Sequence, residues 1–245
     1  MNKVLVIGAS SAQAQATARL FAAEGSRLFL AGRDQQKLDD VAADLKARGA
    51  AQVESLTLDL NDFSRHQELI AAADAALEGL EGALIAHGSL GDQAAGQADY
   101  AVAQGELTTN LLSPISLLTI LANLLEPRGG GCLAVISSVA GDRGRQSNYI
   151  YGTAKGGLSV FLSGLRNRLH RAGVRVVTIK PGFVDSPMTA HFKKGLLWAK
   201  PEAVAKKIHC AMLKGKDVVY APAFWRLIMF IIKALPEPIF KRLNL

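Results

Sequence analysis

A tyrosine and a lysine four residues apart, Tyr151 and Lys155, have the types and spacing that proton transfer needs. On a helix, side chains at i and i+4 project from one face and lie beside each other. An ammonium beside a phenol lowers the pKa of the phenol, which can then exchange a proton with a substrate oxygen near neutral pH. The nearby Tyr149 has Thr153 four residues later and no cation. We predict that Tyr151 and Lys155 form an acid–base pair; a packed tyrosine beside a surface lysine is the alternative.

Ser138 is the third side chain of this predicted site. It precedes Tyr151 by 13 residues and follows a short apolar run with the length of a buried strand. A serine at the end of a strand can be held toward a substrate, and its hydroxyl can donate a hydrogen bond to the substrate oxygen.

The elements that must hold these side chains alternate along the whole chain. Short, nearly all-apolar runs are typical of strands that are covered on both faces, and longer helical patterns lie between them. This alternation implies parallel strands joined by right-handed crossovers, so we predict one α/β domain with a doubly wound parallel sheet and helices on both faces. The expected strands are 3–7, 27–31, 52–58, 83–86, 132–137, 175–180 and 218–220, and the expected helices are 12–24, 35–48, 62–78, 98–125, 148–172 and 201–213.

A glycine turn between the first strand and the first helix is the candidate for phosphate binding. Gly8 ends the strand, and the amides and positive end of the following helix can meet a pyrophosphate there. Ala12 and Ala14 stand where further glycines are expected, so an ordinary turn is the alternative reading.

Two charged residues after the next strands are candidates for nucleotide recognition. Gly32 stands where a fold of this type that binds NAD places a carboxylate, and Arg33 follows it. Arginine favours the 2′-phosphate of NADP, so this position predicts NADPH, with a solvated arginine as the alternative. Asp59 can accept a hydrogen bond from the adenine amino group or can act as a turn or N-cap aspartate.

Composition excludes several classes of protein. Hydrophobic residues make up 49% of the chain and charged residues 20%, which excludes a disordered or collagenous protein. Two cysteines are too few for a disulfide framework or a thiolate site. No nucleic-acid-binding module is visible, and the N-terminus has no signal peptide, so we expect a cytoplasmic protein. We predict no metal site, because the histidines have no ligand spacing: His66, His87, His170, His191 and His209.

The basic excess lies in the last quarter of the chain. Residues 186–245 contain 11 Lys and Arg against 3 Asp and Glu, although the whole chain has a net charge of only +7. We therefore divide the domain into 1–222 and an apolar, basic C-terminal segment, 223–245.

The C-terminal segment has the pattern of a helix at a membrane surface. Its longest uninterrupted apolar run, 227–232, is far shorter than the roughly 20 residues that span a bilayer. Trp225, Arg226 and Lys233 flank this run as interfacial anchors do. We expect either peripheral contact with the inner face of the membrane or packing on the domain or on a second subunit.

Together these residues resemble the short-chain dehydrogenase/reductase family over about residues 3–188. The resemblance implies a Rossmann-type fold and NAD(P)H-dependent reduction of a ketone to an alcohol. The residues that match the family's motifs are Gly8–Ala14, Asn110, Ser138, Tyr151, Lys155 and Pro181–Ser186.

The resemblance also implies a role for each residue. Tyr151 would protonate the carbonyl oxygen as hydride arrives, and Lys155 would also hold the nicotinamide ribose. Ser138 would hydrogen-bond the substrate oxygen, and Asn110 would hold a water that returns the proton. The expected NADPH-binding residues are Gly8, Ser10, Ser11, Ala12, Arg33, Asp59, Gly88, Tyr151, Lys155, Pro181, Val184 and Ser186.

Three features depart from the family pattern. Ala12 and Ala14 replace glycines, Ala86-His87-Gly88 replaces Asn-Ala-Gly, and Ser186 replaces a usual threonine while keeping the hydroxyl.

The C-terminal segment is similar to that of the branch that contains decaprenylphosphoryl-2-keto-ribose reductase, which implies a lipidic or lipid-linked keto-sugar substrate. A soluble reductase of 3-oxoacyl thioesters or of carbonyls in general is the alternative, and a nucleotide-binding protein without turnover is a third hypothesis. The family resemblance implies a homodimer or homotetramer formed through helices 98–125 and 148–172.

Overall fold

The computed structural model describes residues 1–190 and 192–243, and a parallel sheet lies at its centre. The described strands follow the order β3-β2-β1-β4-β5-β6-β7, so the winding direction reverses between β1 and β4. The predicted doubly wound sheet is therefore confirmed. The strands are β1 (Lys3–Ile7), β2 (Arg27–Gly32), β3 (Gln52–Thr57), β4 (Gly82–Ile85), β5 (Gly131–Ile136), β6 (Val174–Pro181) and β7 (Val218–Ala221). His191 and the last two residues of the C-terminal segment lie outside the described residues.

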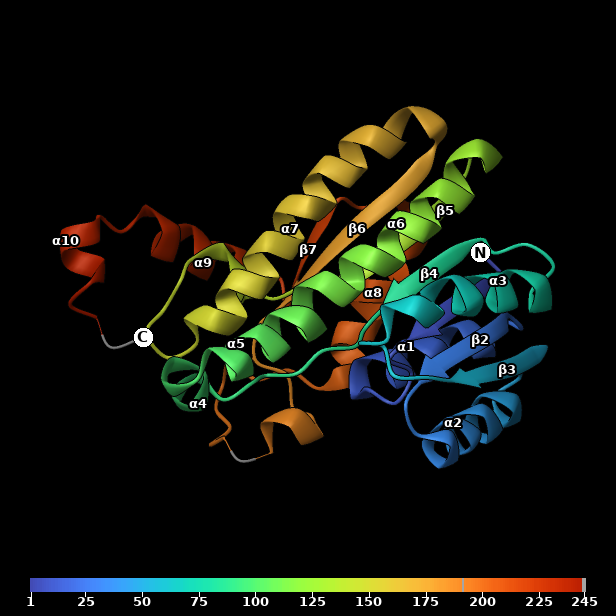
Figure 1. Cartoon of the computed structure of the whole chain (residues 1–245), viewed down its shortest axis with the longest axis horizontal. Helices are drawn as coiled ribbons and strands as arrows, with labels where there is room; N and C mark the ends of the chain where they lie inside the picture. Colours follow the sequence, from blue (N-terminus) through green and yellow to red (C-terminus); the bar gives the residue numbers. More distant parts are fainter. Residues whose placement is uncertain (191, 244–245) are drawn as a thin grey trace.

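Helices cover both faces of the sheet, as predicted (Figure 1). Successive strand residues point to opposite faces, so Leu5 and Ile7 belong to one core, whereas Val4 and Val6 belong to the other. The first core packs against α3 (His66–Ala76), α6 (Ser113–Leu125) and α7 (Tyr149–Leu169). The second packs against α1 (Ala12–Ala23), α2 (Gln35–Ala47) and α8 (Pro201–Lys214).

Local sequence signals set the ends of several helices. The Ser11 hydroxyl caps α1 by accepting a hydrogen bond from the Ala14 amide at 3.2 Å. Gly25 and Gly49 follow α1 and α2 with φ of 75° and 101°, a region that glycine enters without steric cost. Pro201 is the first residue of α8, where its missing N–H leaves no bond unmade.

The predicted helix 98–125 is divided, which corrects the sequence interpretation. Asp99 is extended, with φ −135° and ψ 118°, and its carboxylate caps the next helix at the Ala101 amide. Pro114 has no N–H to donate to the carbonyl of Asn110 four residues earlier, so the regular ladder is interrupted there. The segments are α4 (Gln93–Ala98), α5 (Tyr100–Leu107), a π-helical turn (Thr108–Leu112) and then α6.

The helical run Tyr100–Arg128 is long and apolar enough to cross a membrane by length and composition, with a mean hydropathy of 1.4. In its α6 part, however, Leu117, Leu121 and Leu125 are at most 1% exposed and pack against the sheet. We therefore interpret this run as a core element of the domain.

The C-terminal segment packs beside the turn that follows β5. Helix α9 (Trp225–Ala234) and the short α10 (Glu237–Phe240) extend beyond α7 at one end of the molecule (Figure 1). Trp225 and Met229 are buried against Val139 in a small core of their own. One face of α9 is thus docked on the domain, as one of the two interpretations predicted.

Arg143 binds the C-terminal end of α9. Its guanidinium donates to the carbonyl oxygens of Ile232 and Leu235 at 2.6 and 2.7 Å, which satisfies acceptors at the end of α9. It also lies 3.6 Å from the centre of the Phe240 ring.

Glycines allow the turn after β5 to touch α7 backbone to backbone. This turn is a 3₁₀ helix, Val139–Asp142, that crosses the first turns of α7. A Cβ at Gly141 would lie 2.5 Å from the Gly156 nitrogen, and one at Gly152 would lie 3.0 Å from the Ala140 oxygen. Any side chain at Gly141 would therefore push the turn away from the helix.

We expect Gly141→Ala to destabilise the protein, because the new methyl group meets backbone that cannot move aside. Overpacking of this kind costs about 1–3 kcal/mol, which corresponds to a loss of roughly 3–10 °C in Tm for a domain of this size. The matched control is Gly144→Ala, since a Cβ at Gly144 meets nothing within 4 Å. Equal Tm values for the two variants, measured by thermal denaturation, would contradict the close contact.

Candidate active site

The structure brings Ser138, Tyr151 and Lys155 together at the carboxyl ends of the central strands. Ser138 directly precedes the 3₁₀ turn after β5 and accepts from the Ala140 amide at 3.1 Å. Tyr151 and Lys155 lie on α7, and Lys155 Nζ is 5.7 Å from the centre of the Tyr151 ring. A hydrogen bond between the side chains of Ser138 and Tyr151 contributes a lowering of the pKa of the phenol. Tyr151 and Lys155 therefore lie on one face of α7, as predicted.

Lys155 carries its amine into the interior. The residue is 3% exposed, and Nζ donates to the carbonyl oxygen of Ile136 at 3.2 Å. Burial disfavours the charged form and lowers the pKa of Lys155 to about 8. The ammonium thus loses a proton more easily than an ordinary lysine does.

The phenol of Tyr151 differs from the sequence expectation. Burial raises the pKa of Tyr151 to about 12, and the hydrogen bond with Ser138 only partly opposes this shift. The expected lowering by Lys155 is not found in this structure, because removal of the phenol from water outweighs the other contributions to its pKa. The phenol therefore remains protonated at neutral pH, as a proton donor must.

Asn110 holds the loop that follows β4. It lies in the π-helical turn and is fully buried. Its Oδ1 accepts from the Ser89 amide, and its Nδ2 donates to Ser89 Oγ and to the Glu106 carbonyl, each at 3.2 Å. A Cβ at Gly88 would lie 2.7 Å from Asn110 Oδ1 and 3.3 Å from Lys155 Nζ. Gly88 therefore joins the same cluster, and only glycine fits there.

His87 fastens this loop to α6. Its Nε2 lies 2.9 Å from Ser113 Oγ, and the Ser113 hydroxyl donates its own proton to the Leu60 carbonyl. Nε2 must therefore carry the proton of the His87–Ser113 bond. Burial lowers the pKa of His87 to about 3, so the ring is neutral. This bond anchors the loop next to the position of the missing asparagine: His87 stands where the family pattern has alanine, and Ala86 stands where it has asparagine.

The turn after β1 can hold the phosphates of a dinucleotide. Gly8 has a φ of 78°, and a Cβ there would lie 2.5 Å from the His87 nitrogen, so no larger residue fits. Ser10 is exposed, whereas Ser11 and Ala12 are half-buried at the start of α1. Ala14 is 0% exposed within the core, so its methyl group packs inward and does not fill the turn. The residues present therefore fit a pyrophosphate at the helix N-terminus.

Arg33 and Asp59 lie after β2 and β3 and are both exposed. Within the described residues, no hydrogen bond or ion pair engages the Arg33 guanidinium, which leaves it available for a phosphate. Asp59 accepts from the Asn61 amide at 2.9 Å and thus has the turn role that the sequence left open. Nothing in this contact requires adenine.

The remaining predicted cofactor residues form the loop after β6. Pro181 ends β6 beside Ala221 of β7. Val184 is 4% exposed, and its carbonyl accepts from Thr189 Oγ1 at 2.6 Å. The Ser186 amide donates to the same hydroxyl at 3.2 Å. The loop thus lies beyond the carboxyl end of a strand, on the edge of the sheet where doubly wound folds bind ligands.

Glu106 is a residue of this cluster that the sequence interpretation missed. It is 6% exposed and lies four residues before Asn110, so helical spacing placed it on the same face. A carboxylate one turn before a candidate site residue was the available signal.

Across residues 1–190 and 192–243, no group of three potential metal-ligating residues is found.

Comparison with known proteins adds sequence and fold matches. A family profile described as short chain dehydrogenase matches residues 2–196. A Mycobacterium tuberculosis protein named uncharacterized oxidoreductase is 39% identical over 240 residues, covering 98% of this chain and 96% of its own. A Streptomyces coelicolor protein, also named uncharacterized oxidoreductase, is 35% identical over 243 residues, covering 99% and 96%. The crystal structure of levodione reductase superposes with a TM-score of 0.84 at 20% identity, covering 92% of this chain and 98% of that chain.

Proposed function

The chain belongs to the short-chain dehydrogenase family and is an oxidoreductase, and on that premise we propose that it reduces a ketone to an alcohol with NADPH. The family implies a nicotinamide cofactor and a small-molecule substrate. The observation that carries the proposal is the placement of Ser138, Tyr151 and Lys155 at one end of the sheet, with a protonated phenol beside a buried amine.

Each side chain has a distinct task in this reaction. Reduced nicotinamide supplies a hydride when it is bound. Tyr151 donates its hydroxyl proton to the carbonyl oxygen, and Ser138 donates a hydrogen bond to that oxygen. Lys155 binds the nicotinamide ribose, and its positive charge stabilises the phenolate that remains. The carbonyl of Asn110, which Pro114 cannot engage, holds the water that returns a proton through Lys155.

NADPH is favoured over NADH by the position of Arg33. The guanidinium is exposed after β2, where the 2′-substituent of the adenine ribose lies in folds of this type. Gly32 occupies the position of the carboxylate that would accept from a 2′-hydroxyl. A 2′-phosphate thus meets a cation there, while the neighbouring Asp34 caps α2 and pairs with Lys37 Nζ at 3.0 Å.

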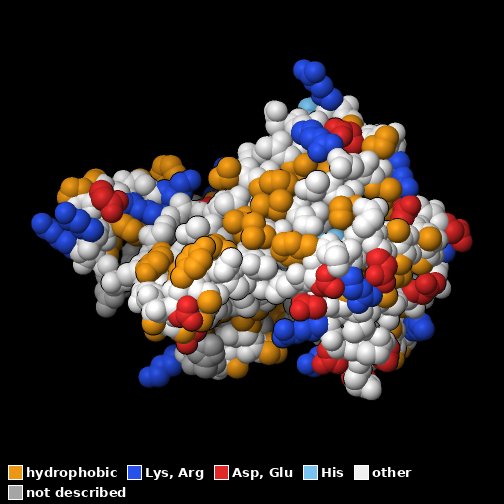
Figure 2. Space-filling view, in the orientation of Figure 1, with side chains coloured by type: hydrophobic (Ala, Val, Ile, Leu, Met, Phe, Trp, Pro, Cys, Tyr) orange, Lys and Arg blue, Asp and Glu red, His pale blue; other side chains and the backbone are white. Residues whose placement is uncertain are grey.

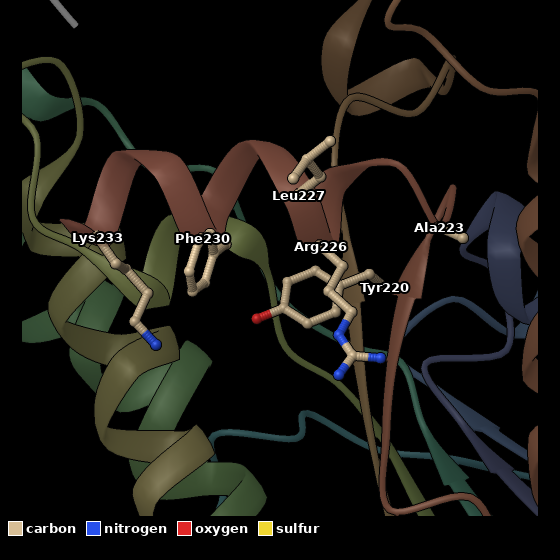
Figure 3. Close-up of a pocket in the computed structure, with 6 residues that line it drawn as sticks. All are labelled: Tyr220, Ala223, Arg226, Leu227, Phe230 and Lys233. Carbon is tan, nitrogen blue, oxygen red and sulfur yellow. The ribbon is translucent and has the colours of Figure 1, made fainter. Parts of the chain in front are cut away.

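The substrate is lipidic or lipid-linked, and the outer face of α9 supports this part of the proposal. Leu227, Phe230 and Ile231 are 64%, 70% and 53% exposed. Arg226 and Lys233 point from α9 to the side on which Phe230 lies (Figure 3). Hydrophobic and basic side chains gather at this end of the molecule (Figure 2). A surface of anionic lipid matches both the apolar face and the cations.

The docked face of α9 packs against the loop that follows β6. The Trp225 ring is 5.2 Å from that of Phe183, which stacks on Trp198 at 5.3 Å. A Cβ at Gly182 would overlap the Trp225 indole. Helix α9 therefore offers its outer face to a lipid and packs its inner face against the loop that follows β6. The tail of decaprenylphosphoryl-2-keto-ribose reductase is similar, so we take a lipid-linked keto-sugar as the first substrate class to test.

A cytoplasmic protein that binds the inner face of the membrane follows from this proposal. Exposed Leu112 and Val160, on the π-helical turn and α7, support a homodimer or homotetramer. The alternative is a soluble reductase of 3-oxoacyl thioesters or general carbonyls, in which α9 would cover a second copy of the chain. A nucleotide-binding protein without turnover is less well supported, because Ala14 packs in the core and leaves the turn open.

Tyr151→Phe is expected to lower ketone-dependent NADPH oxidation by at least about 100-fold, because the general acid is removed. NADPH binding, followed by fluorescence titration, should remain. The matched control is Tyr149→Phe, which alters an exposed phenol two residues earlier and should keep activity. Retained turnover in Tyr151→Phe would refute the proposed proton donor.

Arg33→Ala is expected to weaken NADPH binding more than about tenfold and to leave NADH binding nearly unchanged, since only NADPH carries the phosphate. Dissociation constants for both nucleotides provide the measurement. Arg171→Ala removes another exposed arginine far from β2 and serves as the control. An equal loss for both nucleotides in Arg33→Ala would remove the reason to prefer NADPH.

Leu227→Glu with Phe230→Glu should abolish co-flotation with vesicles of phosphatidylglycerol and phosphatidylcholine. Both side chains are exposed, so the fold should tolerate the change. Leu213→Glu places a carboxylate on α8, where the side chain is 38% exposed, and should still float. Failure of the unaltered chain to float, together with dimer loss in the double variant, would favour the soluble alternative.

A further inference from the structure

Glu106 is a buried acid that the proposed reaction does not use. It lies in the last turn of α5 and is 6% exposed, and its Oε1 has neither solvent contact nor a hydrogen-bond partner in the described structure. Burial of an ionisable group without compensation is costly, so a buried carboxyl without a full set of hydrogen bonds requires an explanation.

The surroundings of Glu106 place its carboxyl in the catalytic cluster. Its backbone carbonyl accepts from Asn110 Nδ2 at 3.2 Å. A Cβ at Gly91 would overlap the Glu106 carboxyl, so the loop after β4 lies directly on this group. The same loop contains Gly88, whose Cβ position is 3.3 Å from Lys155 Nζ. One short loop thus covers both the carboxyl and the amine.

The electrostatic environment couples the same groups. Burial lowers the pKa of Lys155, and attraction to Glu106 opposes that shift. Burial raises the pKa of Glu106, and attraction to Lys155 opposes it in turn. Glu106 also raises the pKa of Tyr151. His87 is a further titratable group that interacts with Lys155; burial keeps its ring neutral by lowering its pKa to about 3.

We propose that Glu106 is a positioning residue whose carboxylate is the counter-charge of Lys155, keeping this buried amine in its ammonium form beside Tyr151. Only the catalytic consequence rests on the proposed reductase function. The charge state of Lys155 is a property of the folded chain and can be measured without turnover.

The direct test is the protonation midpoint of Lys155, followed through the ¹³Cε resonance of lysine-labelled protein. Comparison with Lys155→Met assigns the signal. In Glu106→Gln, the midpoint should fall by about one pH unit, the usual effect of losing one nearby opposite charge. Glu202→Gln removes the same charge from the exposed first turn of α8 and should leave the midpoint unchanged.

A conservative variant separates charge from packing. Glu106→Asp keeps the carboxylate and should restore most of the midpoint, whereas a purely structural role predicts no rescue. Thermal denaturation shows whether each variant folds. If Glu106→Gln does not fold, Glu106→Asp alone still tests the proposal. An unchanged or raised midpoint in folded Glu106→Gln would overturn the proposal, as would a Lys155 midpoint in Glu106→Asp about one unit below the unaltered chain.

Turnover provides the second readout. Removal of the negative charge lowers the pKa of both Tyr151 and Lys155, so the alkaline limb of kcat/KM for ketone reduction should move about one unit toward lower pH. If no ketone is reduced by the unaltered chain, the proposed function fails, while the ¹³C titration still decides the role of Glu106. A shifted midpoint with an unshifted alkaline limb would overturn the catalytic consequence alone.

Discussion

The close crossing of the turn after β5 over the start of α7 is the contact on which the rest of the site depends. Glycine at position 141 lets this turn approach the α7 backbone at Gly156. The crossing places Ser138, just before the turn, near Tyr151 on the helix, and Lys155 follows one helical turn later. The outer side of the same turn receives Trp225 and Met229 of α9. A single packing contact therefore sets both the reacting groups and the seat of the C-terminal segment.

Removal from water then sets the chemistry of these groups. Burial keeps the phenol of Tyr151 protonated and makes the Lys155 amine easier to deprotonate. The lowered pKa of Lys155 works against proton donation by Tyr151. If the amine were neutral, no cation would stabilise the phenolate that remains after Tyr151 gives up its proton. The carboxyl of Glu106 lies in the same buried cluster and favours the ammonium. The carboxyl of a residue on α5 thus takes part in the acid–base balance of two residues on α7.

Much of the fold and of the candidate site can be predicted from the sequence, because strand burial and helical spacing leave local patterns. Doubly covered strands are nearly all apolar, so β1 and β2 are predicted to within one residue. Spacing on one helix suffices to pair Tyr151 with Lys155. The break at Asp99 and the π-helical turn at Asn110 follow from local signals that the sequence interpretation did not use, the Asp99 cap at the Ala101 amide and the missing N–H of Pro114. The raised pKa of Tyr151 reflects its depth in the fold, and the His87–Ser113 bond joins residues 26 apart in the chain, neither of which a local pattern encodes.

The most direct test of the central claim is a crystal structure of the full chain with NADPH. The account predicts the phosphates at the Gly8 turn and the nicotinamide ribose within hydrogen-bond distance of Lys155 Nζ, with the Tyr151 hydroxyl open to a ketone beside the nicotinamide ring. A dinucleotide bound elsewhere, or a ribose that leaves Lys155 and Tyr151 without contact, would contradict it.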